Sequence, residues 1–349
     1  EYCTSTSYFK SAQRCLPGAG ELPVCNSGSA ALLQAVSDWY ERRYGVKLDP
    51  ETEICSLLGS QEGLAHIALS IVDEGDVVLV PDPCYPIFAD GPSLAGQSLL
   101  YAQREENHYI IDLKEIPEKV AQRAKFMIVS YPNNPTAVLA PDSFYEELIA
   151  FAKKYDIIVL HDNAYSELVF DGRTCGSFCV SQEREKSEWN LIPVKTYGLA
   201  GARVGFCVGN KEVVSHLKTL KSNMDYGMFL PIQKAAIAAI TGDQSCVAST
   251  RAAYERRRDC LCDGLASIGW KMEKPEGTMF VWAPIPAGFS DSMEFVKTLF
   301  EKTGVLVTPG SAFGPSGEGH VRMALVQDED AIALAVQRID ASGILKSEQ

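Results

Sequence analysis

The sequence predicts an α/β fold in which a large domain with a mostly parallel sheet is followed by a smaller α+β domain. Three apolar, β-branched runs, at residues 76–83, 125–136 and 155–165, carry the first prediction. Continuous apolar runs of this length are typical of parallel strands that are buried on both faces. Amphipathic stretches separate the runs, and such alternation favours a sheet with helices on both sides.

Two of these amphipathic stretches are the clearest helix signals. Residues 57–72 predict a strand end, a glycine turn and then a helix with one apolar face. The segment "PDSFYEELIAFAKKY" predicts a second helix of the same kind, with Asp142 as its N-cap.

The pattern changes after about residue 250. A long helix is expected over 249–270, with Leu261 and Leu265 on its inner side. Further strands are expected at 278–286, 304–310 and 320–326, and further helices at 292–304 and 328–344. We therefore expect the large domain to span residues 28–250, and the small domain to comprise residues 1–27 and 251–349.

Composition and charge exclude several classes of partner. With 349 residues and 46% hydrophobic content, the chain can bury a large core. The net charge of −13 would repel polyanions, which argues against nucleic acid and anionic membranes as partners. No apolar run reaches the roughly 18 residues of a membrane span. The first residues do not resemble a signal peptide, because no apolar stretch follows a basic start.

The cysteines predict free thiols in a reducing cytoplasm. Their number, 11, is odd, and they are scattered through apolar segments. The one tight pair, Cys260 and Cys262, has neither a second pair nor a histidine nearby, so no metal site is expected.

Polar clusters follow the predicted strands, where ligands bind in open α/β sheets. Gly59, Ser60 and Gln61 open a helix whose free N–H groups suit a phosphate. Tyr85 follows the next strand in a proline-bracketed turn and could stack on a planar ring. Each feature also has an ordinary explanation, since glycine turns before helices and packed core tyrosines are common.

Two later strands end in the same way. Asn133 and Asn134 lie between prolines that fix the backbone, although Asn-Pro also marks ordinary turns. Asp162 ends a buried strand and needs a partner there, such as a protonated ring nitrogen or an arginine. Tyr165 follows three residues later.

Lys195 and Arg203 complete the set in the segment "IPVKTYGLAGARVGF". A pocket amine beside a cation has a lowered pKa and can act as a Schiff-base nucleophile. The set matches the functional groups of pyridoxal 5′-phosphate. It offers a lysine for an aldehyde, a carboxylate for a ring nitrogen, and an asparagine and a tyrosine for a phenolic oxygen. A helix start and an arginine are available for the phosphate. The combination is far more specific than any one member.

The segments "YPNNPT", "HDNAYSELVFDG", "KTYGLAGARVGFCVGN" and "GSAFGPSGEGHVRMAL" resemble the fold-type I, class I/II aminotransferases. The similarity is to the branch that contains LL-diaminopimelate, aspartate and alanine aminotransferases, and it extends from about Gly28 to the end. It implies pyridoxal phosphate as cofactor, amino-acid and 2-oxo-acid substrates, a ping-pong reaction and a homodimer.

The resemblance also implies a role for each site residue. Lys195 would form the Schiff base, and Asp162 would pair with the pyridine nitrogen. Tyr165 and Asn134 would bind the phenolic oxygen, and Tyr85 would cover the ring face. Ser60, Gln61 and Arg203 would bind the phosphate. Arg322 would bind the substrate α-carboxylate.

Three departures from the family pattern concern cofactor binding. The family's Ser-x-Ser-Lys is Ile192-Pro193-Val194-Lys195 here, and Ala137 replaces the glycine of Asn-Pro-Thr-Gly. The family's tyrosine shortly before the first helix is absent from "AGELPVCNSGSAALLQAV", where Leu22 and Pro23 stand at about its position. At about 1.5–3 kcal/mol per lost hydrogen bond to a charged group, affinity for the cofactor would fall by roughly tens to thousands of fold.

Two other functions remain open from the residues alone. A β-eliminating lyase could use the same catalytic set. A non-catalytic dimer on an aminotransferase scaffold would fit the three departures, although the intact Lys195 argues against it. Cofactor absorbance would distinguish the dimer from the enzymes, and turnover that depends on a keto acid would distinguish a transaminase from a lyase.

Overall fold

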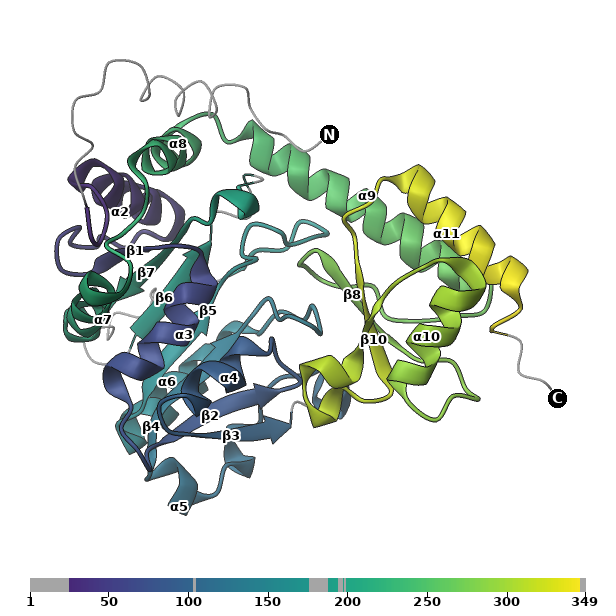
Figure 1. Cartoon of the computed structure of the whole chain (residues 1–349), viewed down its shortest axis with the longest axis horizontal. Coiled ribbons are helices and arrows are strands. Elements are labelled where there is room, and N and C mark those ends of the chain that lie inside the picture. The colour runs from purple at the N-terminus through teal and green to yellow at the C-terminus, as the bar shows by residue number, and fades with distance from the viewer. Residues whose placement is uncertain (1–24, 103–104, 176–187, 194–196, 198, 346–349) are drawn as a thin grey trace.

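The computed structural model describes residues 25–102, 105–175, 188–193, 197 and 199–345. Within them, seven strands form one sheet in the order β1-β7-β6-β5-β4-β2-β3 (Figure 1). These strands are β1 (Ile54–Leu57), β2 (Val77–Asp82), β3 (Gln97–Ala102), β4 (Ala124–Ser130), β5 (Ile158–Asp162), β6 (Glu188–Pro193) and β7 (Gly205–Gly209). Strand β7 is antiparallel to both neighbours, and the other pairings are parallel. The expected mostly parallel mixed sheet is therefore present.

Helices cover both faces of this sheet. One face packs against α3 (Ser60–Ile71), α4 (Ile87–Ser93) and α7 (Lys211–Met224), and the other against α2 (Ala30–Tyr44), α6 (Asp142–Tyr155) and α8 (Leu230–Thr241). The short helix α5 (Glu118–Ala121) precedes β4. Alternate residues of one strand enter different clusters: Val78 and Val80 of β2 face α3 and α4, whereas Val77 and Leu79 face α6. Continuous apolar strands are thus explained by burial on both faces.

The expected cap of helix α6 was wrong by one residue. Pro141 is the N-cap, with an extended backbone (φ −70°, ψ 156°), and Asp142 is the first helical residue. No side chain caps this helix. The Asp142 carboxylate instead lies in the first turn, where a negative charge complements the helix dipole.

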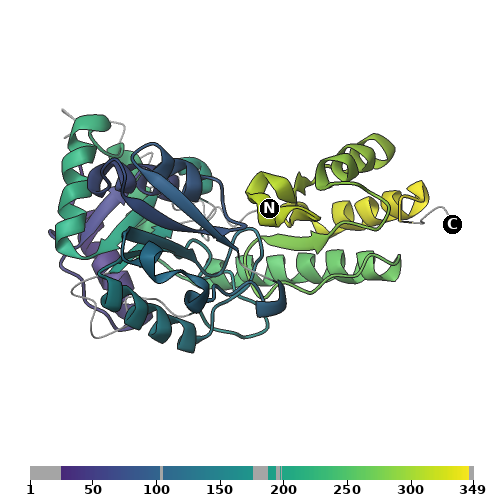
Figure 2. The same ribbon diagram turned by 90° about the horizontal axis from the view of Figure 1, so that it is seen from below.

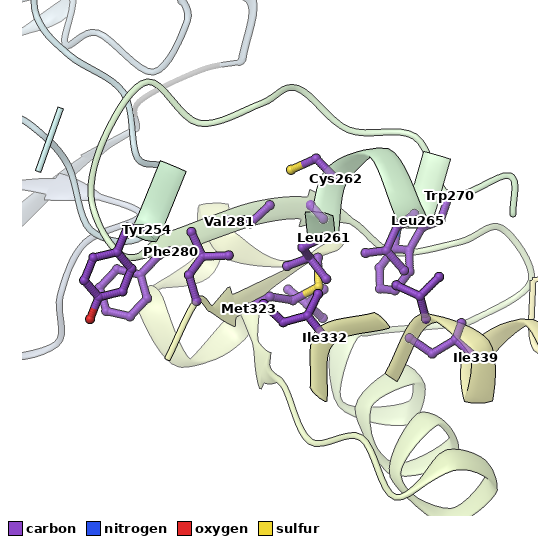
Figure 3. Close-up of a cluster of buried hydrophobic side chains, with 14 of the residues drawn as sticks. Tyr254, Leu261, Cys262, Leu265, Trp270, Phe280, Val281, Met323, Ile332 and Ile339 are labelled. Carbon is purple, nitrogen blue, oxygen red and sulfur yellow. The ribbon is translucent and has the colours of Figure 1, made fainter. Parts of the chain in front are cut away.

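A smaller α+β unit follows along the chain. It contains α9 (Ser245–Ser267), β8 (Phe280–Pro284), α10 (Ser292–Thr303), β9 (Thr308–Pro309), β10 (His320–Ala324) and α11 (Glu329–Ser342). Its core gathers side chains from α9, β8, β10 and α11, among them Leu261, Leu265, Val281 and Ile332 (Figure 3). Leu261 and Leu265 are buried, as the helical pattern predicted.

Helix α9 connects the two units as one continuous helix of 23 residues (Figures 1 and 2). Its first turn packs Cys246 and Val247 into the core beside α2 and α8, and its last turns enter the small core. The domain boundary predicted at residue 250 falls inside this helix. The N-terminal part of the predicted small domain lies almost wholly outside the described residues.

The strand expected over 304–310 is much shorter than predicted. Only Thr308 and Pro309 pair with β10. Gly304 ends α10 in the left-handed conformation (φ +70°), and Val305 and Val307 pack against the small core without pairing. The alternating apolar residues here pack against the small core and do not pair with a strand. A repeat of two residues in the sequence is the same in both cases.

No helix among the described residues is long and apolar enough to cross a membrane.

Candidate active site

The antiparallel strand β7 brings the proposed phosphate residues to the edge where the parallel strands end. Its first residue, Gly205, pairs with Leu57 at the end of β1 and with Pro193 at the end of β6. Arg203, two residues before β7, and Gly59, two residues after β1, therefore meet at this edge. A β-carbon at Gly205 would lie 2.7 Å from the Ser60 nitrogen, so β7 passes close to the start of α3.

Gly59, Ser60 and Arg203 form a site suited to an anion. Gly59 has φ +82°, and a β-carbon there would lie 2.6 Å from Nη2 of Arg203. Only glycine leaves room for the guanidinium beside this turn. The N-terminus of α3 adds backbone N–H groups and the positive end of the helix dipole.

Tyr85 connects this anion site to the end of β2, the next strand along the chain. Its hydroxyl donates to Oε1 of Gln61, the second residue of α3, over 3.3 Å. Its ring packs edge-on against Phe88 at 6.1 Å between centroids. Tyr85 is only partly buried, so part of its ring remains accessible.

The two asparagines after β4 have different roles. Asn133 is fully buried and holds the turn, because its Oδ1 accepts from the backbone N–H and the hydroxyl of Thr136. Asn134 instead faces the small unit, where its Oδ1 accepts from Nη1 of Arg322 over 2.9 Å. The same turn places Ala137 in the left-handed region at φ +63°, a conformation that suits glycine.

Arg322 is held between two phenyl rings. Its guanidinium carbon lies 4.1 Å from the Phe280 ring centroid and 4.6 Å from that of Phe313. Burial lowers the pKa of Arg322, and the phenol groups of Tyr165 and Tyr85 act in the opposite direction. Within the described residues, the buried Nε of Arg322 has no hydrogen-bond acceptor. The guanidinium is therefore oriented and still able to bind an anion.

Asp162 and Tyr165 lie beside these groups. Asp162 ends β5, is 5% exposed, and pairs by strand register with Ser130 on one side and Leu191 on the other. Tyr165 is 2% exposed and packs edge-on against Phe280, the ring that also contacts Arg322. The structure thus brings together eight of the nine predicted site residues.

Lys195 lies outside the described residues. Strand β6 ends two residues before it, and Pro193 pairs with Gly205 beside the start of α3. The chain at Ile192 and Pro193, where the family's serine is missing, therefore runs next to the proposed phosphate site.

One aspartate at the site was missed by the sequence analysis. The Asp82 carboxylate, at the end of β2, accepts from the backbone N–H of Ser316 at 3.2 Å and from its hydroxyl at 2.8 Å. Ser316 belongs to the small unit, so this contact joins the two units. A carboxylate at the tip of a buried strand singled out Asp162, and the same signal was present at Asp82.

A buried lysine supports the turn before α3. The Nζ of Lys221 is fully buried and contacts the carboxylates of Glu62 and Asp225 at 2.8–3.0 Å. Glu62 in turn accepts from the backbone N–H of Leu58. Glu62, His66 and Asp225 lie close enough to hold a metal ion. The Lys221 ammonium contacts both carboxylates and offsets one of their two negative charges, so the cluster is explained as an ion-pair network.

Comparisons with known proteins agree with this geometry. Residues 24–339 match the model of the family "Aminotransferase class I and II". An LL-diaminopimelate aminotransferase of Moorella thermoacetica is 44% identical over 90% of this chain and 81% of its own length. The glutamate-pyruvate aminotransferase AlaC of Escherichia coli is 42% identical over 90% of this chain and 77% of its own.

The chain belongs to the class I and II aminotransferases. A solved structure of a probable N-succinyldiaminopimelate aminotransferase from Thermus thermophilus superimposes with a TM-score of 0.89, at 32% identity, over 96% of this chain and 90% of that one. The fold is therefore that of fold-type I pyridoxal-phosphate enzymes, and the protein is a transaminase that uses pyridoxal phosphate. The predicted family, fold class, enzyme class and cofactor are confirmed.

The described residues of this aminotransferase fit the cofactor. Arg203 and the N-terminus of α3 suit its phosphate, and the buried Asp162 carboxylate suits a protonated ring nitrogen. Tyr165 and Asn134 supply polar groups beside them, and Tyr85 supplies a partly accessible ring.

Proposed function

We propose that the protein transfers the amino group of an L-α-amino acid to a 2-oxo acid, and that Arg322 binds the α-carboxylate of both. The observation that carries this proposal is the guanidinium of Arg322, which Asn134 and two phenyl rings orient while its buried Nε has no acceptor within the described residues. A carboxylate can form two parallel hydrogen bonds with such a group, which fixes its orientation as well as its position.

The remaining residues would take the roles that the family resemblance implies for them. Bound pyridoxal phosphate supplies a ring that accepts the electrons released at the substrate Cα. The Asp162 carboxylate would keep a proton on the ring nitrogen, and Tyr165 and Asn134 would hydrogen-bond to the phenolic oxygen. Arg203, Ser60 and Gln61 would hold the phosphate, and Tyr85 would cover the ring. With the cofactor bound, the Lys195 amine would accept the proton from the substrate Cα and donate it to the aldehyde carbon of the cofactor. Because donor and acceptor use the same groups in turn, the kinetics are ping-pong.

For the amino donor we propose LL-diaminopimelate, with alanine and aspartate as the nearest alternatives. Support comes from the relatives, since several that are 40–44% identical over about 90% of this chain are named LL-diaminopimelate aminotransferases. The glutamate-pyruvate enzyme, at 42%, supports alanine almost as well. A donor panel with 2-oxoglutarate as acceptor will rank the three.

Absorption spectra of the purified protein with added pyridoxal phosphate test the role of Lys195. We expect a visible band from the cofactor joined to Lys195, and we expect the Lys195→Ala variant to lack both the band and turnover. Lys234→Ala, which changes an exposed lysine on α8, is the matched control and keeps both. A band that survives in Lys195→Ala would contradict the assignment. Release of ammonia without a 2-oxo acid would indicate a lyase instead.

We also propose that the protein is a homodimer. Three large apolar side chains, Met224, Tyr226 and Phe229, are 50–63% exposed within six residues of the α7–α8 connection. Such a patch favours an interface over free solvent. Sedimentation analysis should show a dimer for the unmodified chain and dissociation for Tyr226→Asp. Leu334→Asp, at a 47% exposed leucine on α11, is the control and should remain dimeric.

We place the protein in the cytoplasm. No disulfide joins any two of the eight cysteines that the structure describes, and six of them are buried. Such thiols are typical of proteins in a reducing compartment. Fractionation of the native cells should recover the transaminase activity with the cytoplasmic proteins.

A further inference from the structure

The end of strand β2 is joined to a tight turn of the small unit, here called the Phe313 turn (Gly310–Gly317). Asp82 accepts the backbone N–H and the hydroxyl of Ser316. Two residues further along, the Cys84 N–H donates to the Phe313 carbonyl over 2.8 Å. Two attachments to one strand end therefore fix the turn against the large unit.

The turn has little freedom to adopt another shape. A β-carbon at Gly310 would lie 1.9 Å from the Gly317 carbonyl oxygen, and one at Gly317 would lie 2.1 Å from the Gly310 oxygen. At Gly314, where φ is +117°, a β-carbon would lie 2.2 Å from Oδ1 of Asp82. The carboxylate thus fills the space that only glycine leaves open, and the turn closes around it.

The turn carries one of the two rings that hold Arg322. The Phe313 side chain is 4% exposed, lies 4.6 Å from the Arg322 guanidinium carbon, and packs edge-on against Trp282. Phe280 and Trp282, by contrast, lie on β8, the strand that pairs directly with β10 and Arg322. Phe313 therefore depends on the Phe313 turn for its position, whereas Phe280 is fixed by the small sheet itself.

We propose that Asp82 is a positioning residue for the substrate-carboxylate arginine. It holds the Phe313 turn against β2, and through the Phe313 ring it sets the orientation of the Arg322 guanidinium. Asn134 sets the same guanidinium from the end of the neighbouring strand β4. Two adjacent strand ends of the large unit thus align an arginine that belongs to the small unit. This inference rests on the proposed role of Arg322.

The burial of Asp82 is consistent with a specific role. Its residue is 5% exposed, and burial raises the pKa of its carboxyl while the Ser316 hydrogen bonds oppose that change. A buried carboxylate is costly unless it is hydrogen-bonded, and the two Ser316 groups supply that compensation only while the turn stays against β2.

Asp82→Asn and Ser316→Ala test the proposal in the full-length protein with pyridoxal phosphate bound. We expect the KM for the amino donor to rise about tenfold in Asp82→Asn, with kcat changed less than about threefold, because an oriented hydrogen bond to a charged group is weakened. Ser316→Ala should show a smaller rise, since its backbone N–H is kept. Ser311→Ala removes a hydroxyl from the same turn that contacts Ser292 within the small unit, and it should leave KM unchanged.

Two further readouts separate a positioning role from a general loss of structure. The reaction with a primary amine that lacks the α-carboxylate should be unaffected by Asp82→Asn, and so should the absorbance of the bound cofactor. Amide hydrogen exchange across residues 310–317 should become faster in that variant. An equal loss for both donors would overturn the positioning role, and unchanged exchange would overturn the attachment itself.

The outcome also distinguishes this inference from the proposed function. If the unmodified protein reacts equally well with amino acids and with amines that lack the carboxylate, the role of Arg322 is wrong, and the positioning role falls with it, whatever the exchange experiment shows. If the unmodified protein prefers amino acids and Asp82→Asn keeps both the preference and the KM, only the inference about Asp82 is wrong.

Discussion

Arg203 and Arg322 are assigned to the two anions of the reaction, and their surroundings are opposite. Arg203 is exposed, lies in the left-handed conformation (φ +57°) and approaches the N-terminus of α3. Arg322 is partly buried, contacts the rings of Phe280 and Phe313, and is hydrogen-bonded to Asn134. The first is supported by a helix dipole, and the second by side chains from both structural units.

The difference follows from what each anion requires. A cofactor phosphate is retained through every turnover, so several moderate contacts with backbone N–H groups and one cation are sufficient. A substrate carboxylate must enter and leave, yet its orientation places Cα for proton transfer. A rigid, partly desolvated guanidinium provides that orientation because little freedom is lost when the substrate binds.

The largest expected effect is at Arg322. Arg322→Lys should lower kcat/KM for amino acids by about 100-fold, since a point charge cannot form the paired hydrogen bonds of a guanidinium. The measurement is steady-state kinetics with the best donor of the panel. Affinity for pyridoxal phosphate should not change. A similar loss of cofactor affinity would show that Arg322 supports the phosphate site instead.

The same substitution at Arg203 should give the reverse pattern. Arg203→Lys is expected to raise the Kd for pyridoxal phosphate about tenfold, because the guanidinium beside Gly59 loses part of its hydrogen bonding. Titration of the cofactor band measures this. With saturating cofactor, the donor KM should remain that of the unmodified protein. A raised KM under those conditions would remove the distinction between the two arginines.

Phe313→Leu sharpens the comparison at the level of one ring. A cation–π contact at a partly desolvated site contributes about 0.5–2 kcal/mol, so we expect the donor KM to rise about fivefold. Tyr155→Leu, which removes a partly buried ring at the end of α6 that packs against Phe151, is the control. An unchanged KM would mean that Phe280 and Asn134 alone orient Arg322.

The smallest expected effect is at Ala137, which stands where the family has glycine. Ala137→Gly relieves a left-handed conformation that costs roughly 1–2 kcal/mol in a non-glycine residue. It also removes a fully buried methyl group and gives the unfolded chain more freedom, which together cost a similar amount. The free energy of unfolding, measured with urea, should therefore change by less than about 1 kcal/mol, with kinetics unaltered. A large stabilisation would show that the turn after β4, which carries Asn134, is strained.

Much of the fold could be predicted because local patterns report local geometry. The apolar runs became β2, β4 and β5, and the amphipathic stretches became α3, α6, α9, α10 and α11. The two errors, at Asp142 and over 304–310, arose where one pattern fits two structures. A prolyl N-cap displaced the aspartate by one position, and apolar alternation served packing in place of pairing.

The sequence by itself determined the family and the chemistry-bearing residue types, because these depend on motifs that lie within a few residues of one another. Only the tertiary structure decided which groups meet. Asn134 and Arg322 are 188 residues apart, and Asp82 and Ser316 are 234 apart. Asp82 and Asp162 look alike in sequence, since each ends a buried strand. Asp82 joins the two structural units, whereas Asp162 lies at the proposed cofactor site. The order of the strands in the sheet places different partners beside each strand end.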